Sequence, residues 1–236
     1  MITIVCWKWE GSSQYRSKFT SEHVRILAAM IRRNTTLDHR IVCVTDDVRS
    51  VWGIPNVRPV QIWDEPDIQL PESVPNCYRR LKLFDKHLPL NVFGDRMISI
   101  DLDCVIVGNI DHILSEQADF CGWSMGAMPF NGSLWSLRVR SRPHVWEYFR
   151  GESSRQLAAS FGYIGSDQAW MSYALSHKEK RFTPQEHGVY SWKRHIKGKR
   201  LPDNARIVFF HGYPDPWEVD VETTPNSSFI REHYRE

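Results

Sequence analysis

The sequence lacks any long hydrophobic run, and no apolar stretch approaches the roughly 20 residues that a membrane-spanning helix needs. It also lacks a charge excess, because 30 Lys and Arg residues against 28 Asp and Glu residues leave a formal charge of +2. This balance argues against a protein that binds nucleic acid or a membrane surface through a broad basic face. Internal repeats, low-complexity tracts and a convincing linker are absent too, so we predict a single domain.

The sequence has few cysteines, and its five contain neither a CxxC pair nor the spacing of metal ligands. Four of them lie inside or beside apolar runs, where cysteine acts as a small hydrophobe: Cys6, Cys43, Cys104 and Cys121. The N-terminal run ITIV breaks into WKWEG and is too short for a signal peptide. We therefore expect a reduced, cytoplasmic protein.

What is present is an alternation of strand-like and helix-like segments in the first half. Apolar runs predict strands at 2–7, 40–45, 56–62 and 96–100, and helical spacing predicts helices at 21–33 and 77–88. The second half predicts strands at 119–123, 132–139 and 206–211 and helices at 143–150 and 167–175. This order favours an α/β fold, a Rossmann-like mixed sheet flanked by helices, in which ligands bind beyond the carboxyl ends of the strands.

Two aspartates follow one of these strands directly. Asp101 and Asp103 come after RMISI (96–100), and residues two apart in an extended chain point to the same side. Two carboxylates beside apolar runs repel each other and lose solvation, which a divalent cation with oxygen ligands, Mg²⁺ or Mn²⁺, would relieve. In the alternative, one aspartate caps a turn and the other is solvated; placement at the end of a buried strand favours the metal.

The segment around these aspartates resembles the DxD segment of GT-A-fold glycosyltransferases, especially family 8 and its bacterial relatives. Further stretches match in the same order over roughly residues 2–218: VCWKW, HRIVCVTDD, YRRLKLF, FNGSLW, GSDQAWM and FFHGYPDPWE. The resemblance implies one GT-A domain over residues 1–218, with a nucleotide-binding half (1–107), an acceptor and sugar half (108–218) and a C-terminal tail (219–236).

The resemblance also implies roles for the matching residues. Asp101, Asp103 and His211 are the expected metal ligands, and an imidazole among carboxylates moves the preference from Mg²⁺ toward Mn²⁺. Asp167 and Gln168 are the expected catalytic residues on the sugar side. The expected donor contacts are Trp7, Lys8, Asp46, Arg79, Lys82, Asp101, Leu102, Asn131, Lys193 and Gly212. Plainer readings stay open: His211 bonded to backbone, Asp167 serving the helix dipole, and the cations simply solvated.

One position departs from the family pattern. Asp215 stands where the family places a lysine that meets the donor diphosphate. A carboxylate at 4 Å from a phosphate would repel it by about 1–4 kcal/mol. Either another cation replaces the lysine, with Lys82, Arg79 and Lys193 as candidates, or this loop is displaced, or catalysis is weak.

The function that we expect is metal-dependent transfer of a hexose from a nucleotide-diphosphate sugar, UDP-sugar favoured, to an acceptor hydroxyl, with retention. A non-catalytic nucleotide-sugar or carbohydrate-binding module is one alternative. The other is a phosphohydrolase of the haloacid-dehalogenase type, with Asp101 as nucleophile and Asp103 as acid and base. The sugar, the acceptor and the oligomeric state stay open.

Overall fold

The fold is built on a seven-stranded mixed sheet. The computed structural model describes residues 1–11, 18–63, 76–124, 126 and 128–236. The strand order is β3-β2-β1-β4-β7-β6-β8, and the strands are β1 (Ile2–Lys8), β2 (His39–Thr45), β3 (Val57–Gln61), β4 (Arg96–Ile100), β6 (Phe120–Trp123), β7 (Asn131–Arg138) and β8 (Lys180–Phe182). β1, β2, β3 and β4 are parallel, whereas β7 runs antiparallel to both β4 and β6. The predicted mixed α/β sheet is confirmed.

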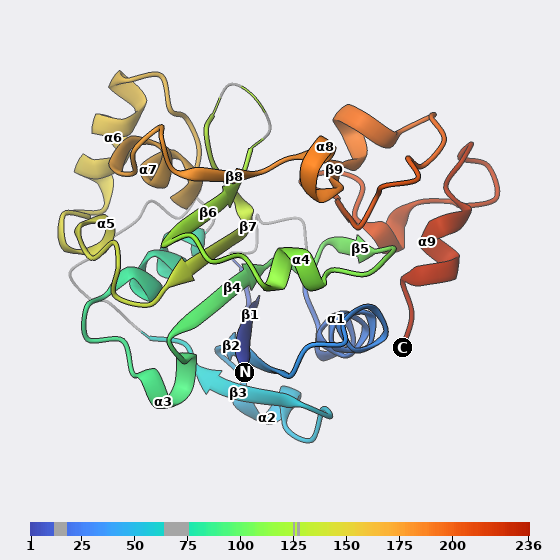
Figure 1. Ribbon diagram of the computed structural model, residues 1–236, viewed down its shortest axis with the longest axis horizontal. Coiled ribbons are helices and arrows are strands. Elements are labelled where there is room, and N and C mark those ends of the chain that lie inside the picture. Colours follow the sequence, from blue (N-terminus) through green and yellow to red (C-terminus); the bar gives the residue numbers. More distant parts are fainter. Residues whose placement is uncertain (12–17, 64–75, 125, 127) are drawn as a thin grey trace.

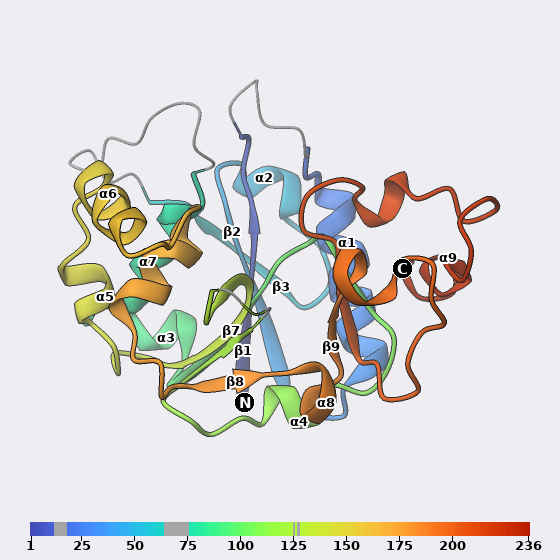
Figure 2. The same cartoon turned by 90° about the horizontal axis from the view of Figure 1, so that it is seen from above.

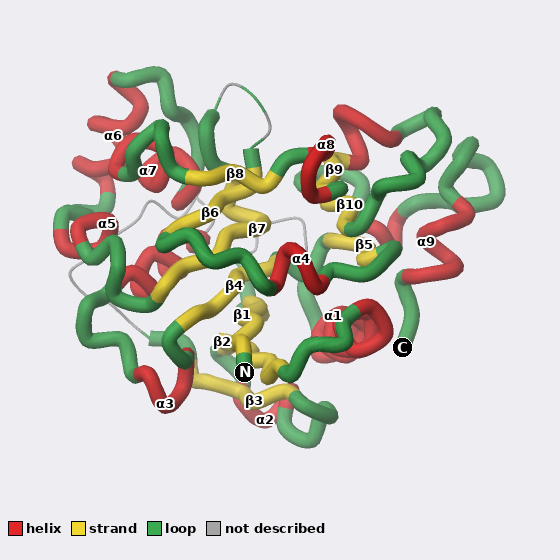
Figure 3. The backbone as a smooth tube through the Cα atoms, viewed as in Figure 1, coloured by secondary structure: helices red, strands yellow, loops and turns green. Residues whose placement is uncertain are grey.

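A smaller three-stranded sheet stands beside the large one (Figure 3). Its order is β5 (Cys104–Ile106), β10 (Ile207–Phe209) and β9 (Val189–Ser191). The chain passes from β4 of the large sheet into β5 of the small one through residues 101–103. The two aspartates therefore mark the crossing between the sheets.

Helices cover both faces of the large sheet. Those described are α1 (Ser21–Asn34), α2 (Val48–Val51), α3 (Leu90–Phe93), α4 (Asp111–Leu114), α5 (His144–Glu147), α6 (Glu152–Ser160), α7 (Asp167–Ala174), α8 (Pro184–His187) and α9 (Ser228–His233). The described residues also form 3-10 helices at η1 (Asn76–Phe84) and η3 (Pro216–Glu218) and a π-helix at η2 (Trp192–Ile196). α1 and α9 lie on one side and α5, α6 and α7 on the other (Figures 1 and 2).

The core divides in two because successive side chains of a strand point to opposite faces. In β1, Ile4 and Cys6 belong to the cluster on the α1 side, whereas Val5 and Trp7 belong to the cluster on the other side. Both faces of the strand are apolar, which is why the sequence runs as an unbroken hydrophobic segment. Because both faces of β1 are buried, the strand is held in the core, and the polar residues begin where it ends.

Two segments differ in detail from the sequence-based expectation. The helix predicted at 77–88 is the 3-10 helix η1, which ends at Phe84. The C-terminal segment carries α9, whose Phe229 and Ile230 are about 5 % exposed and pack in the core with α1. Arg33 of α1 donates hydrogen bonds of 2.8 Å to the carbonyls of His233 and Arg235. None of the described helices has the length and apolar character required to cross a membrane.

Candidate active site

The predicted site residues gather at the carboxyl ends of β1, β2 and β4. Lys8 ends β1, and its ammonium lies 3.9 Å from a carboxylate oxygen of Asp46, which follows β2. The second oxygen of Asp46 accepts the Glu10 backbone N–H at 2.7 Å. Trp7 is instead 4 % exposed, and its indole N–H donates to Ser99 Oγ at 2.8 Å. The Trp7 ring is therefore part of the core, where it helps to hold the end of β1 in place.

Arg80 joins two of the predicted acidic residues. Its guanidinium contacts one Asp101 oxygen through Nη1, and it meets both oxygens of Asp167, with Nε at 2.9 Å and Nη2 at 3.2 Å. Nη1 also donates to the Gly132 carbonyl at 3.1 Å. The side chains of Arg80 and Asp167 are 7 % and 1 % exposed. The planar guanidinium thus forms a buried bridge from the end of β4 to the start of α7.

Strand β7 supports this bridge from behind. A Cβ on Gly132 would lie 3.0 Å from both Arg80 Nη2 and Asp167 Oδ2, so the ion pair occupies space that only glycine leaves. The neighbouring Asn131 donates from Nδ2 to Gln168 Oε1 at 3.0 Å and accepts the Ser133 N–H at 2.8 Å. The structure therefore brings Asn131 and Gln168 together, next to the ion pair of Arg80 and Asp167.

Asp103 is in a different situation. Its oxygen Oδ1 is buried and has no hydrogen-bond partner. Burial, with the nearby charges of Asp101 and Asp215, raises its pKa to about 8. Burial also raises the pKa of Asp101, against the opposing charge of Arg80. Asp103 is therefore a buried carboxyl with one oxygen that no described residue hydrogen-bonds.

His211 follows β10 at the edge of the small sheet where Asp103 precedes β5, because β10 and β5 pair antiparallel. Phe209 pairs with Cys104, and the Phe210 N–H donates to the Asp103 carbonyl at 2.8 Å, so His211 follows at the same edge. Burial and the charges of Lys193 and Arg194 lower its pKa to about 4, which keeps the imidazole neutral near pH 7. Nε2 is 2.7 Å from Ser191 Oγ. The tautomer in which Nε2–H donates to that hydroxyl leaves the Nδ1 lone pair available to a metal ion.

Lys193 reaches the same edge from the turn after β9. Gly212 has φ +77°, and a Cβ there would lie 2.7 Å from Lys193 Nζ. Asp215, in contrast, is 1 % exposed, and its backbone N–H donates to Glu218 at 2.8 Å at the start of η3. Of the candidates to replace the family lysine, Lys193 is the one that the fold places against the loop after β10.

The other two candidate cations lie elsewhere. Lys82 Nζ pairs with Asp85 at 3.1 Å and stands 4.7 Å over the ring of Trp146. Arg79 lies three residues before Lys82 on the same side of the 3-10 helix η1. Its carbonyl accepts the Trp63 indole N–H at 2.9 Å. Leu102 is 2 % exposed, and its side chain packs in the core. The cation that sequence reasoning missed is Arg80.

Comparison with solved structures supports the fold. The galactosyltransferase LgtC, in an active-site mutant, matches 98 % of this chain and 94 % of its own with a TM-score of 0.60 at 10 % identity. GlyE, a glycosyltransferase of Streptococcus pneumoniae TIGR4, gives a TM-score of 0.64 at 10 % identity, with 99 % of this chain and 60 % of that one covered. The bifunctional glycosyltransferase WbbM gives 0.56 at 14 % identity, with coverage of 98 % and 51 %.

The chain has the GT-A fold. The predicted fold resemblance is therefore confirmed. No protein-family model matches the sequence, and neither does any curated protein.

The side chains at the edge of this GT-A sheet fit a divalent cation by type. Two carboxylates and a neutral imidazole are the donors that suit Mn²⁺, and the Asp103 oxygen that no described residue hydrogen-bonds offers a ligand position. Among the described residues, however, no three His, Cys, Asp or Glu side chains converge into a metal-binding group. Asp101 is the expected ligand that is not arranged for a metal ion, because its carboxylate contacts Arg80.

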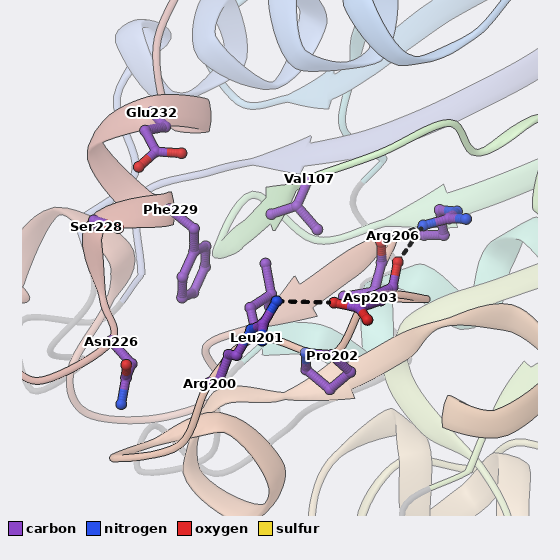
Figure 4. Close-up of a pocket in the computed structure, with 11 residues that line it drawn as sticks. Val107, Arg200, Leu201, Pro202, Asp203, Arg206, Asn226, Ser228, Phe229 and Glu232 are labelled. Carbon is purple, nitrogen blue, oxygen red and sulfur yellow. Dashed lines mark hydrogen bonds and ion pairs between the residues drawn. The ribbon is translucent and has the colours of Figure 1, made fainter.

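A separate pocket of about 370 Å³ lies at the opposite end of β10 (Figure 4). Phe229 of α9 and Val107 form part of its wall, and Arg200 pairs across it with Asp203 at 3.5 Å. Both of these charged side chains are more than 85 % exposed, so the pocket is a shallow surface feature. It contains none of the predicted site residues.

Proposed function

We propose that this protein transfers a hexose from a nucleotide-diphosphate sugar, UDP-sugar favoured, to the hydroxyl of an acceptor, with metal dependence and retention of configuration. The observation that carries the proposal is the buried bridge of Arg80 between Asp101 and Asp167, at the strand ends of a GT-A fold. It joins the predicted metal side of the site to the predicted sugar side. The LgtC structure with donor and acceptor sugar analogues shows that a protein of this fold binds both substrates.

The sugar-side cluster (Arg80, Asp101, Asn131, Asp167 and Gln168) would hold the transferred sugar. Asn131 and Gln168 offer amide groups for sugar hydroxyls, and they already orient each other through a 3.0 Å hydrogen bond. Asp167 is neutralised by Arg80, so its first task is to position that guanidinium. Fixed polar groups of this kind stabilise positive charge that develops on an anomeric carbon.

The diphosphate-side cluster (Asp103, Ser191, Lys193, His211 and Gly212) would hold the leaving group. Lys193 supplies the positive charge that Asp215 cannot, and its contact with Gly212 brings the ammonium close to the loop after β10. Asp101, Asp103 and His211 would hold the metal ion, which, when bound, neutralises charge on the departing nucleoside diphosphate. Lys8 and Asp46 are the proposed contacts with the nucleoside, over the buried ring of Trp7.

The remaining expectations stay predictions. These are the division into halves at 107/108, the roles of Arg79, Lys82 and Leu102 as donor contacts, the cytoplasmic location, and a saccharide or other hydroxyl acceptor. The phosphohydrolase alternative loses its support, because the fold is that of GT-A glycosyltransferases and Asp101 is held by Arg80 rather than free to attack phosphorus.

A panel of nucleoside diphosphates, each with and without Mn²⁺, tests the proposal through the melting temperature. A ligand at a hundred times its Kd stabilises a protein by about 2.7 kcal/mol, a readily measured shift. We expect UDP with Mn²⁺ to give the largest shift, Asp103→Asn to remove it, and Asp203→Asn, an exposed control at the far end of β10, to keep it. No shift with any nucleotide would contradict the proposal.

Donor turnover separates the enzyme from the non-catalytic binding module. Release of the nucleoside diphosphate from UDP-hexoses in the presence of Mn²⁺ is expected, and faster release on addition of a competent saccharide. Binding without release, across a panel of acceptors, would instead favour the binding module.

A further inference from the structure

Arg80 holds the sugar side together, and its contact with Asp101 also bears on metal binding. Three carboxyl groups, from Asp101, Asp103 and Asp215, lie close enough to influence one another, and burial raises the pKa of the first two. Arg80 contacts Asp101, whereas Asp103 Oδ1 is buried without a hydrogen-bond partner among the described residues. The guanidinium therefore lies against a carboxylate that a metal ion would share with it.

The position of the guanidinium is fixed independently of Asp101. Two contacts with Asp167, at 2.9 and 3.2 Å, and one with the Gly132 carbonyl, at 3.1 Å, hold it from three directions. Because these contacts do not involve Asp101, losing Asp101 would not release Arg80. The Asp101 carboxylate is the more exposed partner, at 21 % against 1 % for Asp167, and is the group with room to turn away.

We propose that Arg80 is the resident counterion of Asp101 in the ligand-free protein, and that a divalent cation must displace it from this carboxylate to bind. This accounts for the lack of an assembled metal-binding group among the described residues, although the side-chain types suit one. A carboxylate taken out of water without an opposite charge is costly, so the contact with Arg80 stabilises Asp101 in the ligand-free protein. The proposal rests on the proposed function for the choice of Mn²⁺, and not for the contact itself.

Arg80 acts here as a positioning residue with a measurable sign. If it competes with the metal, removing it tightens Mn²⁺ binding, because Asp101 becomes free and the local charge more negative. If it only holds Asp101 in the geometry of a metal ligand, removing it weakens Mn²⁺ binding. The two roles therefore predict opposite changes in the same Kd.

The test is a titration of the full chain with Mn²⁺ alone, in which the free ion is measured by electron paramagnetic resonance without nucleotide. We expect Arg80→Gln to bind Mn²⁺ at least tenfold more tightly than the wild type. Arg80→Lys keeps the charge but cannot span both carboxylates, and we expect it to bind about threefold more tightly. Lys86→Gln removes a charge near the end of η1 that pairs with Glu147 at 2.8 Å, and should change Kd less than twofold.

Unchanged or weaker Mn²⁺ binding by Arg80→Gln, or by Arg80→Lys where the glutamine variant does not fold, would overturn the proposal. The proposal would also be overturned if Lys86→Gln changed the Mn²⁺ Kd by twofold or more and by as much as Arg80→Gln does. The effect would then reflect the overall charge of the protein. Release of nucleoside diphosphate from UDP-hexose is measured on the same wild-type preparation. Turnover with an unmoved Mn²⁺ Kd refutes the counterion role alone, whereas a shifted Kd without turnover refutes the proposed function alone.

Discussion

The two sides of the candidate site differ in whether a cation lies in contact with their carboxylates. In the sugar-side cluster, Arg80, Asp101 and Asp167 form one buried network, and Asn131 pairs with Gln168. In the diphosphate-side cluster, Asp103 Oδ1 is buried without a partner, and the exposed Lys193 side chain rests against Gly212. On one side the carboxylates are in contact with a cation, whereas on the other Asp103 has no ion-pair contact among the described residues.

The difference separates two ways of building a site. A buried network of opposite charges in contact fixes its members in place before any ligand arrives, which favours orientation of a substrate. An unpaired buried carboxyl costs stability in the free protein, and a bound cation recovers that cost. We infer that the sugar side is built for geometry and the diphosphate side for charge.

The largest effect that distinguishes the two sides is expected from Arg80→Met. Removing the guanidinium leaves Asp101 and Asp167 buried without their cation, and breaking a buried pair typically costs about 3–5 kcal/mol. Urea denaturation at pH 7 should show this loss in the free energy of unfolding. Arg25→Met is the control, because Arg25 forms an exposed pair with Glu22 at 3.5 Å and such pairs contribute less than about 1 kcal/mol. Equal losses in both variants would contradict the buried network.

Asp103→Asn should have the opposite sign. Because the folded pKa of Asp103 is about 8 and the ordinary value is 3.8, the unfolded chain ionises first as the pH rises. The wild type therefore loses stability between about pH 4 and pH 8, and the asparagine variant does not lose this part. We expect the variant to match the wild type at pH 4 and to exceed it by about 1–3 kcal/mol at pH 8. Parallel pH profiles of unfolding free energy would show that Asp103 is already balanced.

Gly132→Ala sharpens the comparison from the sugar side. The added Cβ would lie 3.0 Å from the Arg80 and Asp167 side chains, both of which are held by several contacts. Overpacking against a fixed pair costs about 1–3 kcal/mol, and thermal unfolding measures it. An alanine variant with the melting temperature of the wild type would show that the bridge has room to move.

The features of the two sides that depend on neighbouring residues in the chain can be predicted from the sequence. The unbroken apolar runs predict β1, β2 and β4, and the aspartates that follow β4 are placed by the strand itself. The start of α7 is also local, with Ser166 and Asp167 at the helix beginning. These features depend on neighbours in the chain, which a single sequence contains.

Arg80 was not predicted because its burial depends on the pitch of η1. With three residues per turn, Tyr78, Leu81 and Phe84 share one buried stripe, and Arg79 and Lys82 share a half-exposed stripe with Asp85. Arg80 lies on the third stripe, between Cys77 and Leu83. Leu83 three residues on was the available signal, since an apolar neighbour at that spacing marks a buried face. The contact between Lys193 and Gly212 offered no such signal, because it joins β9 to β10 across the small sheet.

Lys193→Met should have the smallest effect on folding and a clear one on binding. Lys193 is exposed, so the free energy of unfolding is expected to stay within about 0.5 kcal/mol of the wild type. A hydrogen bond to a charged group contributes about 1.5–3 kcal/mol, so loss of a placed diphosphate contact should raise the Kd for UDP with Mn²⁺ at least tenfold in calorimetric titration. Lys199→Met removes another exposed lysine, six residues further along the chain, and should leave this Kd within twofold. If both variants weaken binding equally, the diphosphate side works through a diffuse basic field, and the contact with Gly212 does not single out Lys193.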